Sequence, residues 1–205
     1  ANGMIDVDVN VNQSIMSRPL LSELPVLVGR RCRLRELQPG DAPALQRHAD
    51  DEAVWRNLFD GFPRPYTLSH AEAWCGGESR LPAFGHVWGI EIAVPGGHEV
   101  IGCVGAHPLD GWLRCNAEVG YWIGRAHWRQ GITSEALALV SDWAFATLPE
   151  VTRLFAPIFA WNAGSQAVAA RAGYQLEGRM PRSAIKAGEV IDRVVYARYR
   201  PASVH

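Results

Sequence analysis

The residues most able to carry chemistry lie between a predicted strand and a predicted helix. Residues 116–137 indicate an apolar strand, then a basic turn that contains a glycine, then the first turn of a helix. A helix N-terminus presents unpaired backbone N–H groups and partial positive charge, so small and basic residues before it can bind phosphate oxygens. Gly131 lets a ligand approach the backbone because it has no Cβ. The stretch predicts a site for a phosphorylated ligand, although an ordinary strand-to-helix connection also fits it. The residues that the turn supplies are Arg129, Gln130, Gly131, Thr133 and Ser134.

The elements that must position this turn follow from the residues after it. Apolar residues recur at helical spacing before Pro149, which ends the predicted helix. A short apolar run of strand length comes next, then a polar turn and a short helix for which Gly173 is a suitable end. The predicted elements are a helix from Thr133 to Leu148, a strand over 152–160, a helix over 166–172 and a strand over 174–180.

In this order and spacing, three segments resemble a known family. The chain resembles the GNAT superfamily of acyl-CoA-dependent N-acetyltransferases, and within it the RimJ/RimL-like branch, from about Leu27 to Tyr199. The resemblance implies a mixed α/β GNAT fold with a central, mostly antiparallel sheet of about seven strands flanked by helices. The segments are Glu118-Val-Gly-Tyr-Trp-Ile123 with Trp128-Arg-Gln-Gly-Ile-Thr-Ser-Glu-Ala136, Asn162-Ala-Gly-Ser165 with Ala172-Gly-Tyr174, and Ala184-Ile-Lys-Ala-Gly-Glu-Val-Ile-Asp-Arg-Val-Val-Tyr196.

The resemblance implies that the turn binds the pyrophosphate of acetyl-CoA. The family's loop has a Gln or Arg, two residues, a Gly, one residue, and then a Gly or Ala; these places fall on Trp128, Gly131 and Thr133. Thr133 has a side chain where the family has almost none, which would crowd the pyrophosphate or donate a hydroxyl to it. Trp128 supplies no charge, although Arg129 beside it does. Because backbone amides, that of Ile132 included, do most of the phosphate binding, acetyl-CoA binding is expected to survive these departures.

The resemblance assigns the strand before the turn to the pantetheine arm. Tyr121, Trp122 and Ile123 fall where the family pairs its backbone with that arm, as in strand addition. The backbone near Ile123 would then aim an N–H at the thioester carbonyl, which gains negative charge during attack. Tyr121 and Trp122 fit equally well as aromatic residues of the core or of a sheet face. Asn162 is expected to hydrogen-bond the pantetheine, or to serve only as a turn residue.

Two groups are predicted to move protons. Glu118 is the candidate base, acting directly or through water, because it lies in the strand that should carry the thioester. Apolar neighbours would raise the pKa of its carboxyl, although a hydrogen-bonded structural carboxylate also fits. Many relatives have a Tyr acid at the place of Ala169, so the resemblance points instead to Ser165, as in RimL-like enzymes. Its hydroxyl would protonate the leaving thiolate or cap the following helix.

Composition limits the alternatives. The 205 residues include 20 Lys and Arg against 21 Asp and Glu, a net charge of −1, which gives no electrostatic case for binding nucleic acid. No apolar run approaches the roughly 18 residues of a membrane span and no signal peptide opens the chain, so a cytoplasmic protein without membrane contact is expected. The four cysteines lack the spacing of a metal site, so no metal is expected, and Cys103 is predicted to be a small buried residue.

The chain is long enough for one domain with a sizeable core, which is assigned to residues 26–201. Residues 1–25 are interpreted as an N-terminal extension that opens with a tag remnant. Alternating apolar residues from Ile5 to Val11 predict an edge strand, which would pair with a sheet edge or with a second subunit in a homodimer. The other predicted elements are a strand Arg31–Glu36, a helix Asp41–Asp50, one or two short helices over 51–80 that cover the acceptor site, and an antiparallel meander of Trp88–Ile92, Val100–His107 and Glu118–Ile123.

Together these features predict an acetyl-CoA-dependent N-acetyltransferase. The acceptor would be a primary amine, either a protein N-terminus or a small molecule, that attacks directly in a ternary complex. The alternative is a non-catalytic acyl-CoA-binding sensor that keeps the fold without the chemistry. The departures at Thr133, Trp128 and Ala169 leave that alternative open.

Overall fold

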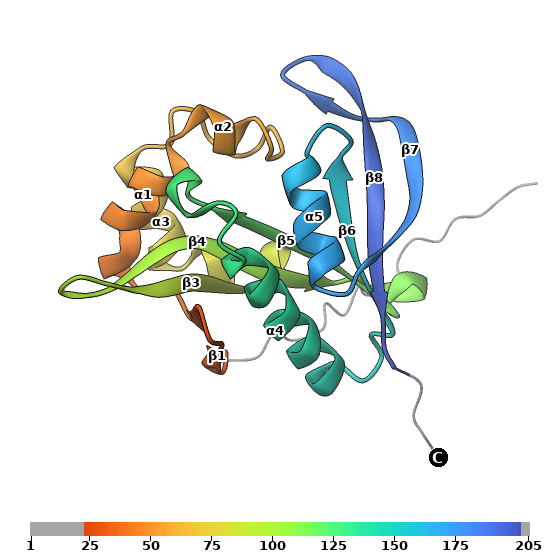
Figure 1. The fold of residues 1–205 in the computed structure, drawn as a ribbon, viewed down its shortest axis with the longest axis horizontal. Helices are drawn as coiled ribbons and strands as arrows, with labels where there is room; N and C mark the ends of the chain where they lie inside the picture. The colour runs from red at the N-terminus through yellow and green to blue at the C-terminus, as the bar shows by residue number, and fades with distance from the viewer. Residues whose placement is uncertain (1–22, 202–205) are drawn as a thin grey trace, which may run out of the picture.

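Residues 23–201, the part of the chain that the computed structural model describes, fold around one eight-stranded sheet (Figure 1). The strand order is β1-β2-β3-β4-β5-β6-β8-β7, and every neighbouring pair is antiparallel except β5 and β6. The predicted mixed α/β fold is confirmed, with eight strands rather than about seven. The strand predicted from Ile5 to Val11 lies outside the described residues. The strands are β1 (Leu27–Val28), β2 (Arg33–Arg35), β3 (His86–Val94), β4 (Gly97–Pro108), β5 (Asn116–Ile123), β6 (Arg153–Phe159), β7 (Gln175–Lys186) and β8 (Glu189–Tyr199), and the helices are α1 (Ala42–Ala49), α2 (Glu52–Trp55), α3 (Leu68–Gly76), α4 (Ile132–Thr147) and α5 (Ala163–Arg171).

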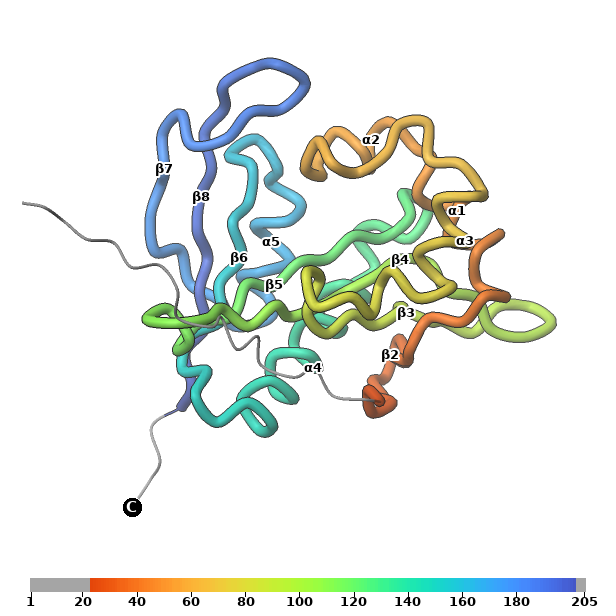
Figure 2. Tube along the Cα trace, turned by 180° about the vertical axis from the view of Figure 1, so that it is seen from behind, coloured from red at the N-terminus to blue at the C-terminus, as the bar shows by residue number. Residues whose placement is uncertain are grey.

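Two apolar clusters anchor the helices to the sheet. α4 and α5 contribute to the larger cluster, which also contains Leu34 and Trp88 from the sheet. α1 and α3 contribute to the smaller cluster, together with Val100 and Cys103 of β4. Cys103 is 4% exposed, so its prediction as a small buried residue is confirmed. Figure 1 and, from behind, Figure 2 show α4 and α3 on opposite sides of the sheet, with α1 beside α3.

The parallel pair β5 and β6 separates soon after it forms. Its register comprises three residue pairs and ends where Glu118 lies opposite Phe155. β5 continues to Ile123 paired with β4, and β6 continues to Phe159 paired with β8. Figures 1 and 2 both show the two strands diverging. Within residues 23–201, the edge of β5 from Val119 onward therefore has no strand partner on the side of β6.

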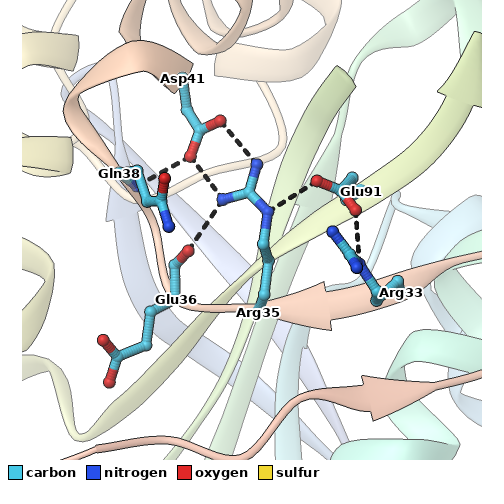
Figure 3. A network of polar contacts seen from close by, with 6 residues as sticks. All are labelled: Arg33, Arg35, Glu36, Gln38, Asp41 and Glu91. Atoms are coloured by element: carbon cyan, nitrogen blue, oxygen red, sulfur yellow. Dashed lines mark hydrogen bonds and ion pairs between the residues drawn. The ribbon is translucent and has the colours of Figure 1, made fainter. Parts of the chain in front are cut away.

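An ionic network fastens the start of α1 to the sheet (Figure 3). Arg35 of β2 donates to both carboxylate oxygens of Asp41 at 2.8 Å and to Glu91 of β3 at 2.6 Å. Glu91, whose side chain is 3% exposed, also accepts from Arg33 at 2.6 Å. Burial alone would raise the pKa of Glu91, but the two guanidinium groups outweigh it and hold that pKa below its usual range. Paired charges therefore fix α1 where its chain leaves the sheet.

The predicted elements agree with the structure apart from shifts at their ends. The turn at residues 95–97 joins β3 to β4, and α4 ends just before Pro149. α5 begins at Ala163 rather than at Gln166, because Asn162 is its N-cap. No helix among the described residues is long and apolar enough to cross a membrane.

Candidate active site

The turn between β5 and α4 presents a helix N-terminus without a side-chain cap. Gly131 is the N-cap of α4 and has a φ of 77°, a left-handed conformation that favours glycine. Arg129 also has a positive φ, of 63°. Because no side chain caps α4, the backbone N–H groups of its first turn can bind an anion. The predicted helix N-terminus behind a glycine turn is confirmed.

An open groove of about 860 Å³ lies beside this turn. Ser134 Oγ is buried there and has no hydrogen-bond partner among the described residues. Since buried hydroxyl groups are normally paired, this oxygen marks a place that a polar group of a ligand would complete. The groove therefore fits a phosphorylated ligand. The predicted cofactor residues that line it are Arg129, Gln130, Gly131 and Ser134.

Three arginines at this groove were missed by the sequence analysis. Arg30 and Arg31 come from the turn between β1 and β2, and Arg171 is the last residue of α5. Glu135 accepts from the backbone N–H of Arg31 at 3.0 Å and from its Nη1 at 3.1 Å. Burial opposes the ionisation of Glu135, but these donors outweigh it and lower its pKa. With Arg129 the lining has four arginines against this one carboxylate, which suits phosphate groups.

Two predicted cofactor residues turn their side chains away from the groove. Ile132 and Thr133 are 5% and 8% exposed, and neither is among the residues that line it. The expectation that the Thr133 side chain would crowd the pyrophosphate does not hold, because α4 directs this side chain toward the core. Trp128, at the place where the family has a Gln or Arg, makes a hydrogen bond within the protein: its Nε1 donates to the carbonyl of Ile123 at 2.9 Å. It thereby fastens the turn to the end of β5.

The residues predicted for the pantetheine arm lie on the unpaired edge of β5. Tyr121 and Ile123 pack with the cluster of α4 and α5, whereas Trp122 packs with that of α1 and α3. The ring of Trp122 meets Phe62 edge-on, with 5.8 Å between centroids. The aromatic side chains thus agree with the interpretation of Tyr121 and Trp122 as residues of a sheet face. The backbone of this edge is left for an extended ligand, except that the Ile123 carbonyl already accepts a hydrogen bond from Trp128.

Tyr121 and Ser165 form a hydrogen-bonded pair that joins β5 to α5. The tyrosine hydroxyl donates to the Ser165 carbonyl at 3.0 Å and accepts from Ser165 Oγ at 2.9 Å. Burial raises the pKa of Tyr121 to about 12, so this hydroxyl stays protonated near neutral pH. The interpretation of Ser165 as the helix cap is wrong, because Asn162 Oδ1 caps α5 by accepting from the Ser165 N–H at 3.0 Å. Asn162 agrees with its interpretation as a turn residue.

Glu118 lies on the other face of β5, opposite His107 of β4. Its side chain is exposed, yet the surrounding protein displaces enough water to raise the pKa of its carboxyl. The positive charges of His107 and Arg193 oppose this shift without cancelling it. The predicted direction of the pKa shift is confirmed. No hydrogen bond from another residue of 23–201 holds the carboxylate, which argues against a purely structural role.

The segment after α2 contacts the β7–β8 turn and the end of β6. Asp60 lies 3.0 Å from Nζ of Lys186, and that Nζ is 3.5 Å from the ring centre of Trp55. Nε1 of Trp161, just past the end of β6, donates to Asn57 at 3.2 Å. These contacts tie the segment to the β7–β8 turn and to the start of α5 (Figure 1). Trp55 and Trp161 thus take part in the contacts that hold this segment.

The free edge of β5 runs from the uncapped N-terminus of α4 toward the carboxylate of Glu118. Such an edge suits a ligand with a phosphorylated end and an extended arm of amide groups, which can add to the sheet as a further strand. Acyl carriers of the coenzyme A type have this form. Among the described residues no group of His, Cys, Asp or Glu is arranged to hold a metal ion. Fold and site together define an acyltransferase.

Comparison with known proteins names the family. The model of the acetyltransferase (GNAT) domain matches residues 31–175. The uncharacterized N-acetyltransferase YoaA of Bacillus subtilis (strain 168) is 31% identical over 185 residues, which cover 86% of this chain and 98% of that protein. The ribosomal-protein-serine acetyltransferase of Escherichia coli (strain K12) is 34% identical over 101 residues, 49% of this chain and 55% of that protein. Mycobacterium smegmatis RimJ, solved in complex with CoA-disulfide, has a TM-score of 0.70 at 24% identity, covering 85% of this chain and 87% of its own. The chain belongs to the GNAT acetyltransferase family and shares the fold of RimJ and RimL.

Proposed function

We propose that this chain transfers the acetyl group of acetyl-CoA to a primary amine, which attacks directly in a ternary complex. The observation that carries the proposal is the unpaired edge of β5, which connects the groove at α4 with Glu118. The pantetheine arm contains amide groups that can pair with this edge. One extended ligand would then place its phosphates at the groove and its thioester beside the proton acceptor.

The groove residues are assigned to the phosphates of acetyl-CoA. Arg129 and Gln130 supply side chains, Ser134 supplies its unpaired hydroxyl, and the first turn of α4 supplies backbone N–H groups, those of Ile132 and Thr133 included. The backbone from Tyr121 to Ile123 is assigned to the pantetheine. Asn162 remains a candidate for the same arm only through its NH₂ group, since its oxygen caps α5.

Glu118 is assigned as the base. The acceptor ammonium must lose a proton before its nitrogen attacks the thioester carbon, and a carboxylate with a raised pKa accepts that proton directly or through water. As the C–N bond forms and the C–S bond breaks, the nitrogen releases its second proton and the thiolate takes one up. A backbone N–H near Ile123 would stabilise the negative charge on the carbonyl oxygen.

Ser165 is assigned to the departing thiolate. In the structure its hydroxyl hydrogen is directed at Tyr121, so the serine must rotate to reach the sulfur. The tyrosine remains held by the Ser165 carbonyl during that rotation, because this second hydrogen bond does not involve Oγ. The pair therefore keeps the serine beside β5 without fixing its hydroxyl.

For the acceptor we favour a peptide N-terminal amine over a small-molecule amine. The name of the Escherichia coli relative, a ribosomal-protein-serine acetyltransferase, supports a protein acceptor. The ring of Trp161, just past the end of β6, is 41% exposed and suits an amine-bearing substrate through cation–π contact. The ternary complex raises the reaction rate by holding the amine and the thioester close together in the right orientation.

A transfer assay with the full chain and acetyl-CoA tests the proposal. The acceptors are peptides with a free N-terminal serine, the same peptides with a blocked N-terminus and a free lysine, and small primary amines. Mass spectrometry identifies the acetylated atom, and thiol release gives the rate. We expect N-terminal acetylation that is lost in Glu118→Gln and kept in Glu150→Gln, which removes an exposed carboxylate paired with Arg114. Acetyl-CoA binding without transfer to any amine would favour the sensor, and transfer to small amines alone would exclude the peptide acceptor.

A further inference from the structure

His48 lies in the last turn of α1, on the layer of the molecule opposite α4. Its Nε2 is 2.6 Å from Oε1 of Glu99, at the start of β4. The other oxygen of Glu99 lies 3.3 Å from Arg47. The contact with His48 is the largest cause of the lowered pKa of Glu99. The side chain of His48 is only 14% exposed, so the imidazole is held in one orientation.

This ring rests against the residue that follows β5. A Cβ on Gly124 would lie 2.3 Å from Nδ1 of His48, so only a glycine fits beneath the ring. The ring also meets His127 edge-on, with centroids 5.2 Å apart and an interplanar angle of 68°. Gly124 and His127 are the two ends of one tight turn, in which the His127 N–H donates to the Gly124 carbonyl at 2.9 Å. His48 therefore contacts both ends of this turn.

The turn leads directly into the groove at α4. Trp128 follows it and binds the carbonyl of Ile123 at 2.9 Å, while Gln130 Nε2 donates to the carbonyl of Ala126 at 3.1 Å. These two hydrogen bonds lie within the segment itself. His48 contacts the segment from α1, and the ionic network of Figure 3 fixes the start of α1 to the sheet.

We propose that His48, oriented by Glu99, is a positioning residue for the phosphate-binding turn. By resting on Gly124 it sets the direction in which the chain leaves β5, and so the placement of Arg129 and Gly131 at the groove. This inference rests on the proposed function, in which that groove receives acetyl-CoA. It adds that α1, which lies on the side of the sheet opposite α4, holds the phosphate-binding turn in place.

The first test compares His48→Ala with Arg47→Gln. In His48→Ala we expect faster amide hydrogen exchange over residues 124–131 of the ligand-free protein. By calorimetry its Kd for acetyl-CoA should rise about tenfold, the size of one lost hydrogen-bonded contact. The KM for acetyl-CoA should rise similarly while kcat changes little. Arg47→Gln removes the other contact of Glu99 and leaves the imidazole in place, so all these quantities should stay at the wild-type values.

The second test uses the tight contact itself. The backbone of Gly124 has φ −53° and ψ 139°, which alanine adopts without strain, so Gly124→Ala is costly only through its clash with His48. We expect Gly124→Ala to weaken acetyl-CoA binding more than tenfold. The double variant with His48→Ala should bind better than Gly124→Ala alone. Rescue would show that the loss in Gly124→Ala arises from its contact with His48.

Three results would contradict either the role of His48 or the proposed function on which it rests. An unchanged exchange rate over 124–131 and an unchanged Kd in a folded His48→Ala would overturn the positioning role. Additive effects in the double variant, without rescue, would overturn it too. Wild-type protein that does not bind acetyl-CoA would instead overturn the proposed function, and the exchange data alone would then decide whether His48 orders the turn.

Discussion

The two faces of β5 are built in different ways. On the face toward α4 and α5, Ile123 is buried and Tyr121 is held by two hydrogen bonds to Ser165. On the other face, Glu118 is exposed, and no other residue of 23–201 hydrogen-bonds its carboxylate. The first face is fixed by packing and hydrogen bonds, which suits the placement of the acetyl donor. The second face leaves the Glu118 carboxylate without a partner, which suits the acceptance of a proton. Because β6 diverges from β5 after Glu118, the edge of β5 between these two environments has no strand partner on that side among residues 23–201.

The largest expected effect on activity comes from Glu118, on the face of β5 where the carboxylate has no partner. Glu118→Gln should lower kcat by about 10²–10⁴-fold while leaving the Kd for acetyl-CoA unchanged, because the base acts on the acceptor. In the wild type the rate should fall as pH drops through the pKa of Glu118, which lies above its usual value, since only the ionised form accepts a proton. The pH profile of Glu118→Gln should lack this acidic limb. An unchanged kcat in this variant would remove Glu118 from the mechanism.

A smaller effect is expected when the groove receives a negative charge. Ser134→Asp should raise the Kd for acetyl-CoA at least about tenfold, because the added carboxylate faces the phosphates at short range. The same substitution places an acid in the first turn of α4, which favours the helix, so the protein should remain folded. Ser134→Ala, which removes only the hydroxyl, should raise Kd about fivefold. Calorimetry gives both values, and equal Kd values for all three proteins would place the phosphates elsewhere.

The rigid face should respond less strongly than the free one. Ser165→Ala should lower kcat about tenfold with little change in Kd, if its hydroxyl serves the thiolate. Tyr121→Phe should have a milder effect, since it releases the serine hydroxyl from its partner. The two substitutions should be non-additive in a double-mutant cycle because they share one contact. If both variants lose only thermal stability and keep kcat, the pair does no more than hold α5 against β5.

The smallest effect on activity is expected far from β5, in the network that fixes α1. Glu91→Gln should lower the free energy of unfolding at pH 7 by about 2 kcal/mol, because two arginines lose their charged partner. The pKa of Glu91 is lowered in the folded state. Its contribution is therefore complete above the unfolded value of about 4.3 and disappears as pH falls through the lower folded value. Denaturant unfolding at several pH values measures this.

The matched control for this network is Glu189→Gln, which removes an exposed carboxylate at the β7–β8 turn. It should leave the free energy of unfolding near the wild-type value. A difference between wild type and Glu91→Gln that persists at acid pH would show that packing, and not charge, fixes α1 there.

Local chemistry at the turn was predictable from the sequence, because Gly131 and the helix behind it are neighbours in the chain. The inward direction of Thr133 was also within reach. Thr133 lies three and four residues before Ala136 and Leu137, on the stripe that α4 buries. The cap of α5 was misplaced because Asn162 and Ser165 are both cap-forming types, and only the backbone shows which one precedes the helix.

The parts that the sequence did not predict come from distant segments. Arg30 reaches the groove from the first hairpin, and Arg171 reaches it from the far end of α5. His48 of α1 contacts Gly124 after β5, although 76 positions separate the two residues in the sequence. Such contacts depend on how the layers pack, and spacing in one sequence carries no signal for them.

The most direct measurement is amide hydrogen exchange of the wild-type protein with and without acetyl-CoA. We expect slower exchange over residues 119–123 and 131–135, where the arm and the phosphates should add hydrogen bonds, and unchanged exchange in β7. Protection of the first turn of α4 alone would show that the arm does not use the strand edge. Binding that protects neither segment would contradict the placement of acetyl-CoA between the groove and β5.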